Sequence, residues 1–340
     1  MQQSETILEI KDLCVQFNTV EGTVLAINHL NYTLHKGEKL GIVGESGSGK
    51  SVSAYSVMRI LTDTGRVTGG EVLFKGENIL NYTPQQMQKF RGSRISIIFQ
   101  DPMTCLNPTF SIGSQLREAI RIHTDRNKEQ IQARAVEMLQ LVGVNEPERR
   151  LRQYPHELSG GMRQRVMIAM ALACEPDILI ADEPTTALDV TIQAQILELM
   201  QSLQKKLGMA IIMITHDLGV IADMCDEIIV MYGGKVCERG TADEICYNPR
   251  HEYTKGLIRS IPRISEKHEK LVPIAGSPVD LLNLPKGCAF AARCDHAMKI
   301  CLEQPPEEIR VNDFHIAACW NNVRQMMEDG QLEVKDGEEV

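Results

Sequence analysis

The segment Gly44–Ser51 (Gly-Glu-Ser-Gly-Ser-Gly-Lys-Ser) has the residue types and spacing of a loop that binds phosphate groups. It directly follows Lys39–Val43, a short apolar run that is typical of a buried strand. Its glycines let successive backbone N–H groups turn inward around phosphates, the Lys50 ammonium can reach the β- and γ-phosphate oxygens, and the Ser51 hydroxyl can ligate Mg²⁺. We therefore predict a nucleoside triphosphate site here. Its expected residues are Gly44, Glu45, Ser46, Gly47, Ser48, Gly49, Lys50 and Ser51.

Two adjacent carboxylates follow another apolar run, Asp177–Ala181. Asp182 closes this expected strand, a position from which a carboxylate can help to hold the Mg²⁺ of a bound triphosphate. Glu183 comes next and can polarise the attacking water. The alternative is an acidic turn before Pro184 with no catalytic role.

Gln100 and His216 also stand directly after short apolar runs. The carboxyl ends of parallel strands form the edge at which α/β proteins bind ligands, so both side chains are expected there. The Gln100 amide could reach the metal or the water, and His216 could hydrogen-bond the γ-phosphate. Each residue taken alone would be an ordinary structural residue, and only its place in the ordered set favours the site.

A second anion site is expected at Leu158-Ser159-Gly160-Gly161. A hydroxyl and backbone N–H groups at a helix N-terminus attract negative charge. Because the chain already has a phosphate loop, this second site is predicted to act on a nucleotide bound to another chain. Asp189, which precedes the next expected helix, either caps that helix or also acts at the partner's site.

The order of the elements predicts an α/β fold. Short apolar runs, typical of strands covered on both faces, alternate with helical patterns such as Val190–Leu207, which implies a mostly parallel sheet. A polar, strand-free stretch predicts a helical insertion at about 104–157. From about residue 246 onward, prolines are expected to interrupt regular structure in an appended region, and the acidic end, 326–340, is expected to be a flexible tail.

Composition limits the class of protein and its partners. The 340 residues are 43% hydrophobic, which is typical of a globular protein. Their net charge of -9 argues against nucleic acid as the main partner. We find no signal peptide and no apolar run of the ~18 residues that a membrane helix needs. The chain is thus expected to bind a membrane complex without crossing the bilayer. Ten cysteines without a secretory signal favour a reducing compartment.

Four of these cysteines, Cys288, Cys294, Cys301 and Cys319, lie in the appended region with the spacing C-x5-C-x6-C-x17-C. Structural zinc sites usually contain pairs two to four residues apart, whereas iron–sulfur clusters accept wider spacings. Three interpretations of the four cysteines therefore remain: an iron–sulfur cluster, a zinc ion, or unliganded buried thiols. The cluster is favoured. The other six cysteines are scattered and are interpreted as core or surface residues.

Together, the phosphate loop, Gln100, Ser159–Gly161, Asp182-Glu183, Asp189 and His216 resemble the ATP-binding cassette (ABC) family over about residues 5–245. The resemblance implies an ABC-type P-loop NTPase domain with an antiparallel β subdomain. It also implies hydrolysis of ATP to ADP and phosphate in a head-to-tail dimer, where each ATP contacts one chain's phosphate loop and the other chain's Ser159–Gly161. Phe17 is similar to the aromatic residue that stacks on adenine, although a core role is its alternative. Met162 departs from the family's usual glutamine.

The tail is similar to the C-terminal extension of dipeptide and oligopeptide importer ATPases, here residues 246–325. The similarity rests on His251–Leu257, Gly276–Pro278, Leu284–Phe290, Cys319-Trp320 and the earlier Gln100–Pro108. It implies a 4Fe-4S cluster on the four cysteines.

The same similarity implies a set of partners and a place in the cell. The expected partners are a second, paralogous ATPase, two transmembrane permease subunits and an extracytoplasmic solute-binding protein, and the expected place is the cytoplasmic face of the cell membrane. Import of nickel or glutathione is an alternative to peptide import. A non-transport ABC ATPase acting on ribosomes or DNA is a second alternative.

Overall fold

The computed structural model describes residues 5–101, 105–186, 188–261 and 273–330. Most of the predicted flexible tail lies outside these residues. The chain divides into two units, each built from separate stretches of sequence. The first unit consists of Met1–Leu8, Leu34–Lys39 and Phe74–Ile214, and the second of Glu9–Thr33, Leu40–Leu73 and Thr215–Val340.

The first unit contains a run of parallel strands in the order β8-β7-β6. These strands are β6 (Ile95–Ile98), β7 (Ile178–Asp182) and β8 (Ala210–Thr215). Every residue of β7 and β8 is buried, which explains why their sequences are continuous apolar runs rather than alternating ones. The predicted parallel α/β arrangement is confirmed in this part of the chain.

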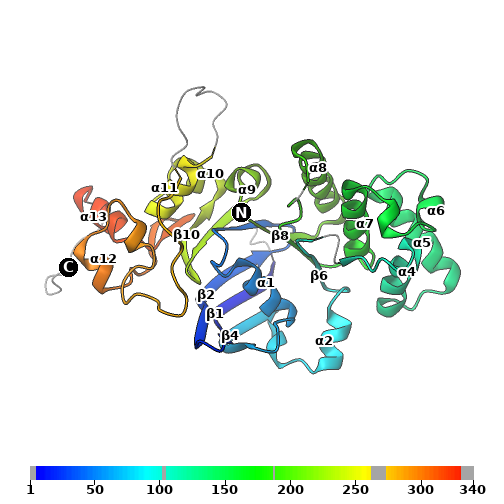
Figure 1. The fold of residues 1–340 in the computed structure, drawn as a ribbon, viewed down its shortest axis with the longest axis horizontal. Helices are drawn as coiled ribbons and strands as arrows, with labels where there is room; N and C mark the ends of the chain where they lie inside the picture. The colour runs from blue at the N-terminus through cyan, green and yellow to red at the C-terminus, as the bar shows by residue number, and fades with distance from the viewer. Residues whose placement is uncertain (1–4, 102–104, 187, 262–272, 331–340) are drawn as a thin grey trace. The chain divides into compact units, whose positions relative to one another are not determined.

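Helices make up most of the remaining first unit (Figure 1). They are α2 (Pro84–Phe90), α4 (Ile112–His123), α5 (Lys128–Leu141), α6 (Pro147–Arg150), α7 (Gly160–Leu172) and α8 (Val190–Leu207), with short 3-10 turns at Ile79–Asn81 and Pro155–Glu157. Helices α4 to α6 lie within the predicted helical insertion. Helix α8 has the predicted bounds and ends at Gly208, whose φ of 66° is the left-handed conformation common after helices.

The second unit contains strands in the order β11-β12-β10-β9-β3. They are β3 (Lys39–Val43), β9 (Glu227–Tyr232), β10 (Lys235–Thr241), β11 (Ile309–Asn312) and β12 (His315–Ala317). Strand β3 is parallel to β9, and the pairs β9–β10, β10–β12 and β11–β12 are antiparallel. The phosphate loop therefore follows strand β3, which is paired with β9, a strand from the last third of the chain.

A further set of strands in the second unit has the order β2-β1-β4, side by side in Figure 1. Their bounds are Thr23–His35 for β2, Thr6–Asn18 for β1 and Gly65–Phe74 for β4; the short β5 is Glu77–Asn78. Strand β1 is thus one long strand of 13 residues. A turn closed by hydrogen bonds between Thr19 and Gly22 joins it to β2.

The C-terminal region has more regular structure than its prolines suggested. The helices of the second unit are α1 (Lys50–Met58), α9 (Leu218–Met224), α10 (Ala242–Tyr247), α11 (Glu252–Arg259), α12 (Lys299–Glu303) and α13 (Trp320–Glu328), with a 3-10 turn at Ala291–Arg293. Strands β11 and β12 were not predicted. Strand β12 pairs with β10, and β11 pairs with β12. In β12, buried His315 lies between two carboxylates, with Nε2 2.7 Å from Glu238 and Nδ1 3.1 Å from Glu244.

Among the helices that the structure describes, none has both the length and the apolar character that a membrane crossing requires.

Candidate active site

The phosphate loop lies in the second unit between β3 and α1, as predicted. Lys50 is 5% exposed, and its Nζ donates hydrogen bonds to the carbonyl oxygens of Gly44 (2.6 Å) and Glu45 (2.9 Å). The Ser48 hydroxyl is buried and has no hydrogen-bond partner among the described residues. Such an atom is unfavourable unless a ligand satisfies it, so the loop has the character of a site built for an oxygen-rich anion.

Gly49 closes the loop immediately before α1 and has a φ of 100°. A Cβ atom at this position would lie 2.6 Å from the carbonyl oxygen of Ala26. Both the left-handed backbone and this close contact exclude a side chain. The glycine in the motif is therefore a requirement of the loop geometry.

In the first unit, the structure brings Gln100 and Glu183 together. Gln100 Nε2 donates to Glu183 Oε2 at 2.9 Å, and Thr186 Oγ1 donates to the same oxygen at 2.9 Å. Glu183 has a φ of 48°, and its N–H donates to the carbonyl of Ile214 at 2.8 Å. This left-handed backbone conformation is uncommon for a glutamate, and three hydrogen bonds hold the residue in place. Residues with such strained conformations are often found at functional sites.

Asp182 is the last residue of β7 and is 1% exposed. Strand β7 is paired with β6 and β8, so the carboxylate lies at the buried end of the central strand of this group. The hydroxyl of Ser51, the carboxylate of Asp182 and the amide oxygen of Gln100 are all oxygen donors, which is the donor chemistry that Mg²⁺ requires.

The segment Ser159–Gly161 also belongs to the first unit. Ser159 is the N-cap of α7, and its Oγ accepts a hydrogen bond from Met162 N at 3.4 Å. A Cβ at Gly161 would lie 2.9 Å from Ile192 Cγ2, so this glycine permits the close approach of α7 and α8. Ser159 and Gly160 are exposed and so accessible to another molecule. Asp189 is exposed at the start of α8, and its side chain makes no capping hydrogen bond.

Phe17 and His216 belong to the second unit. Phe17 is half-buried near the end of β1, where a Cβ on Gly65 would lie 2.6 Å from its ring. The ring thus packs against the Gly65 backbone and keeps part of its surface accessible. His216 is exposed directly after β8. No observation tests the proposed roles of these two residues, which stay predictions.

The four C-terminal cysteines converge. Cys288, Cys294, Cys301 and Cys319 line one small cavity in the second unit. Burial raises the pKa of Cys288 to about 11, and that of Cys294 also to about 11. Among the described residues, no group of three or more His, Cys, Asp or Glu side chains is placed to hold a single metal ion. The cysteines therefore share a cavity without forming a single-ion site.

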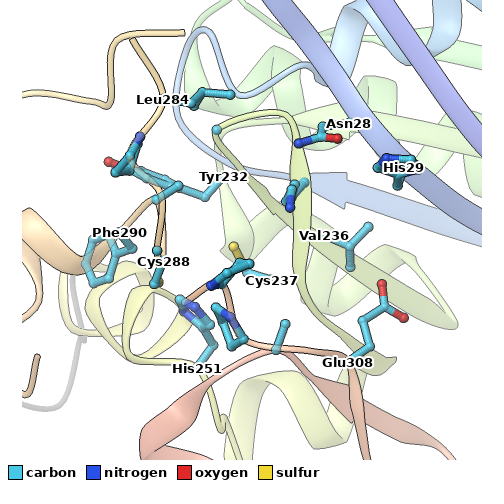
Figure 2. Close-up of a pocket in the computed structure, with 18 of the residues that line it drawn as sticks. Asn28, His29, Tyr232, Val236, Cys237, His251, Leu284, Cys288, Phe290 and Glu308 are labelled. Carbon is cyan, nitrogen blue, oxygen red and sulfur yellow. The ribbon is translucent and has the colours of Figure 1, made fainter. Parts of the chain in front are cut away.

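A larger cavity adjoins this one and shares Cys288, His251 and Phe290 with it (Figure 2). Cys237 of β10 also lines it, and burial together with the neighbouring Cys288 raises the pKa of Cys237 well above its usual value. In the sequence, Cys237 is one of the six scattered cysteines outside the C-x5-C-x6-C-x17-C group. Its proximity to Cys288 arises from the pairing of distant segments, and no local spacing signals it.

Comparison with known proteins decides the family. The model of the ABC transporter family matches residues 27–186, and that of the oligopeptide/dipeptide transporter C-terminal region matches residues 237–301. The oligopeptide transport ATP-binding protein OppD of Bacillus subtilis is 54% identical over 92% of this chain and 88% of its own length. The chain belongs to the ATP-binding proteins of oligopeptide and dipeptide ABC transporters. It is therefore an ABC-type ATPase.

Other relatives agree with this membership. OppD of Escherichia coli is 49% identical and covers 96% of both chains, and the dipeptide transport protein DppD of Bacillus subtilis is 50% identical over 93% of this chain and 95% of its own. Among solved structures, the ABC cassette MJ0796, bound to ADP and phosphate as a dimer, has a TM-score of 0.63 at 28% identity, covering 69% of this chain and 99% of that one. The ABC fold expected from the sequence is thus confirmed.

Replacing Gly49 with Ala should weaken MgATP binding by about tenfold or more, because the new Cβ forces the loop away from the Ala26 carbonyl and strains a left-handed residue. Equilibrium titration with MgATP measures the effect. The matched control is Gly76→Ala, where φ is 86° but nothing lies within 4 Å of the added Cβ. Equal affinities for the two variants would contradict the geometry assigned to the loop.

Proposed function

We propose that this chain is the ATP-hydrolysing subunit of a membrane importer for di- and oligopeptides. The observation that carries the proposal is the sequence similarity to oligopeptide and dipeptide transport ATP-binding proteins, with 50–54% identity over nearly the whole chain. The similarity includes the C-terminal region that is typical of that group. Nickel or glutathione import by the same machinery is the alternative solute assignment.

In the proposed ATP site, the phosphate loop binds the triphosphate through backbone N–H groups and Lys50, and Phe17 stacks on the adenine. Ser51, Asp182 and Gln100 are the residues that would hold Mg²⁺, which supplies charge neutralisation at the transferred phosphate when bound. His216 is assigned a hydrogen bond to the γ-phosphate. The buried, unpaired hydroxyl of Ser48 supports binding of phosphate oxygens in this loop.

Glu183 is proposed as the residue that orients and deprotonates the attacking water. Its carboxylate oxygen Oε2 accepts hydrogen bonds from Gln100 and Thr186, which hold the carboxylate in the orientation from which it would act on the water. The partner ATPase's counterpart of the Ser159–Gly161 segment would complete the site. Its hydroxyl and N–H groups would stabilise charge on the γ-phosphoryl group. The exposed Ser159 and Gly160 of this chain, with Asp189, would do the same for the partner's nucleotide.

The proposed docking site for the membrane permease lies in the first unit. A groove there is lined mainly by apolar side chains, among them Phe99, Leu106, Met167 and Met170. Apolar grooves of this kind accept an amphipathic helix. Because the groove also contains Phe99, next to Gln100, movement of Gln100 on nucleotide binding would be transmitted to the permease.

The proposed assembly contains this chain, a paralogous ATPase, two permease subunits and an extracytoplasmic solute-binding protein. The chain would then act at the cytoplasmic face of the membrane. In domain terms, residues 5–245 form the proposed nucleotide-binding domain, with a helical subdomain at about 104–157, and residues 246–325 form the extension. These boundaries stay predictions.

We also propose that Cys288, Cys294, Cys301 and Cys319 hold a 4Fe-4S cluster. Their convergence on one cavity supports this, because four thiolates are the usual ligands of such a cluster. The wide spacing of the four cysteines in the sequence suits a cluster better than zinc, whose structural sites usually contain pairs two to four residues apart. When bound, the cluster would cross-link segments that lie far apart in the sequence.

Glu183→Gln should bind MgATP with wild-type affinity but lower turnover by about 10²–10⁴-fold, because an amide cannot accept the proton of the water. Phosphate release measures turnover, and size-exclusion chromatography with ATP should reveal a trapped dimer. Glu198→Gln, on the exposed surface of α8, is the control. Hydrolysis by Glu183→Gln at the wild-type rate would remove the assignment of this residue as the base.

Affinity capture of the tagged chain from detergent-solubilised membranes should recover two permease subunits and a second ATP-binding chain. Met170→Glu, in the apolar groove, should lower the recovery of the permeases at least severalfold by placing a charge in the groove. Leu302→Glu, at a side chain that is 61% exposed in the C-terminal extension, is the control. Undiminished recovery with Met170→Glu would contradict the docking site, and absence of permeases with the wild type would contradict the proposed function.

Protein purified without oxygen should be brown and contain about four iron atoms and four sulfides per chain if the cluster is present. Cys294→Ser should lose most of this iron, whereas Cys246→Ser, which does not line the cavity, should retain it. Elemental analysis and the visible absorption spectrum measure both. Zinc in place of iron, or neither metal, would contradict the cluster.

A further inference from the structure

The C-terminal extension contacts the phosphate loop at Glu45. Two nitrogens of the Arg293 guanidinium meet the two carboxylate oxygens of Glu45, with Nη1 2.5 Å from Oε2 and Nη2 3.0 Å from Oε1. This paired arrangement is the strongest geometry that arginine and a carboxylate adopt. The contact joins residues 248 positions apart in the sequence, both within the second unit.

Arg293 is held so that its guanidinium cannot easily point elsewhere. Its side chain is 6% exposed, Nε donates to the carbonyl of Ala275 at 2.8 Å, and Nη2 donates to the carbonyl of Ile274 at 3.3 Å. Nη1 also donates to the hydroxyl of Tyr232 at 3.3 Å. The arginine is thus fixed before any ligand binds, a condition under which little further entropy is lost on recognition.

The backbone of Glu45 is held as well. Its N–H donates to the hydroxyl of Tyr253 in α11 at 2.8 Å, and its carbonyl accepts from Lys50 Nζ at 2.9 Å. Glu45 is therefore fixed through its carboxylate, its N–H and its carbonyl, and the last of these contacts is made by the lysine that is proposed to bind the phosphates.

A carboxylate at this position presents an electrostatic problem. Glu45 lies in the loop proposed to bind a triphosphate, and its side chain is 27% exposed, so its charge is only partly screened by water. Unpaired, it would repel the bound phosphates. Arg293 cancels this charge, and because the arginine is nearly buried, its loss would leave the carboxylate without a compensating partner.

Resting on the proposed function as an ATPase, we propose that Arg293 is a positioning residue of the ATP site: it neutralises and fixes Glu45 so that the phosphate loop is ready for the triphosphate. The residue comes from the turn Ala291–Arg293, which lies between Cys288 and Cys294 in sequence. The fold of the cysteine-containing extension thereby determines the affinity of a nucleotide loop near the other end of the chain.

The experiment measures the dissociation constant for MgATP in the full chain carrying Glu183→Gln, so that hydrolysis does not interfere. Arg293→Gln should raise this constant about tenfold, within the range typical of coupling between sites. Arg293→Lys keeps the charge but loses the paired hydrogen bonds, so it should give a smaller increase. Adding Glu45→Gln to Arg293→Gln should restore affinity to within about threefold of the parent, because the repelling charge is then removed as well.

The control is Arg310→Gln, because Arg310 belongs to the same extension but is 69% exposed and pairs with the exposed Asp313. It should leave the constant unchanged. Thermal unfolding of each variant shows whether it is folded, and if Arg293→Gln is not, the comparison of Arg293→Lys with and without Glu45→Gln takes its place.

Two results would overturn the inference. One is a folded Arg293→Gln that binds MgATP as tightly as the parent, and the other is a double variant no better than Arg293→Gln alone. Failure of the parent itself to bind MgATP would instead contradict the proposed function, so the two failures are distinguishable.

Discussion

The parallel pairing of β7 with β6 and β8 is the constraint that brings together the proposed catalytic residues of the first unit. Parallel strands end at the same edge, so residues that follow β6 and β7 meet even though 83 positions separate Gln100 from Glu183. Every residue of β7 and β8 is buried, as is typical of parallel strands that are covered on both faces. The Gln100–Glu183 hydrogen bond is a consequence of this register.

The second unit holds its phosphate loop by a different kind of contact. Backbone geometry at Gly49 shapes the loop, but Glu45 is fixed by side chains from the C-terminal extension, namely Arg293 and Tyr253. The extension is therefore part of the structure that supports the nucleotide loop. This arrangement gives a physical reason for an ATPase of this group to retain a C-terminal region that contributes no motif to the ABC cassette itself.

The cavity lined by the four C-terminal cysteines depends on the same extension. Strand β12 pairs with β10 on one side and with β11 on the other, and Cys319, which lines the cavity, follows two residues after the end of β12. Buried His315, between Glu238 and Glu244, holds β12 against β10. Cys237, on β10 itself, lies near Cys288, and both line the larger cavity.

The sequence by itself determined the features whose physics is local. The phosphate loop, helix α8 with its ends, and the buried strands could be predicted because glycine spacing, capping positions and apolar runs act over a few residues. Tertiary structure alone decided that Arg293 meets Glu45, that Cys237 approaches Cys288, and that β11 and β12 extend the sheet. These contacts join segments tens to hundreds of positions apart, and their energy exists only once the chain has folded, so no local pattern encodes them.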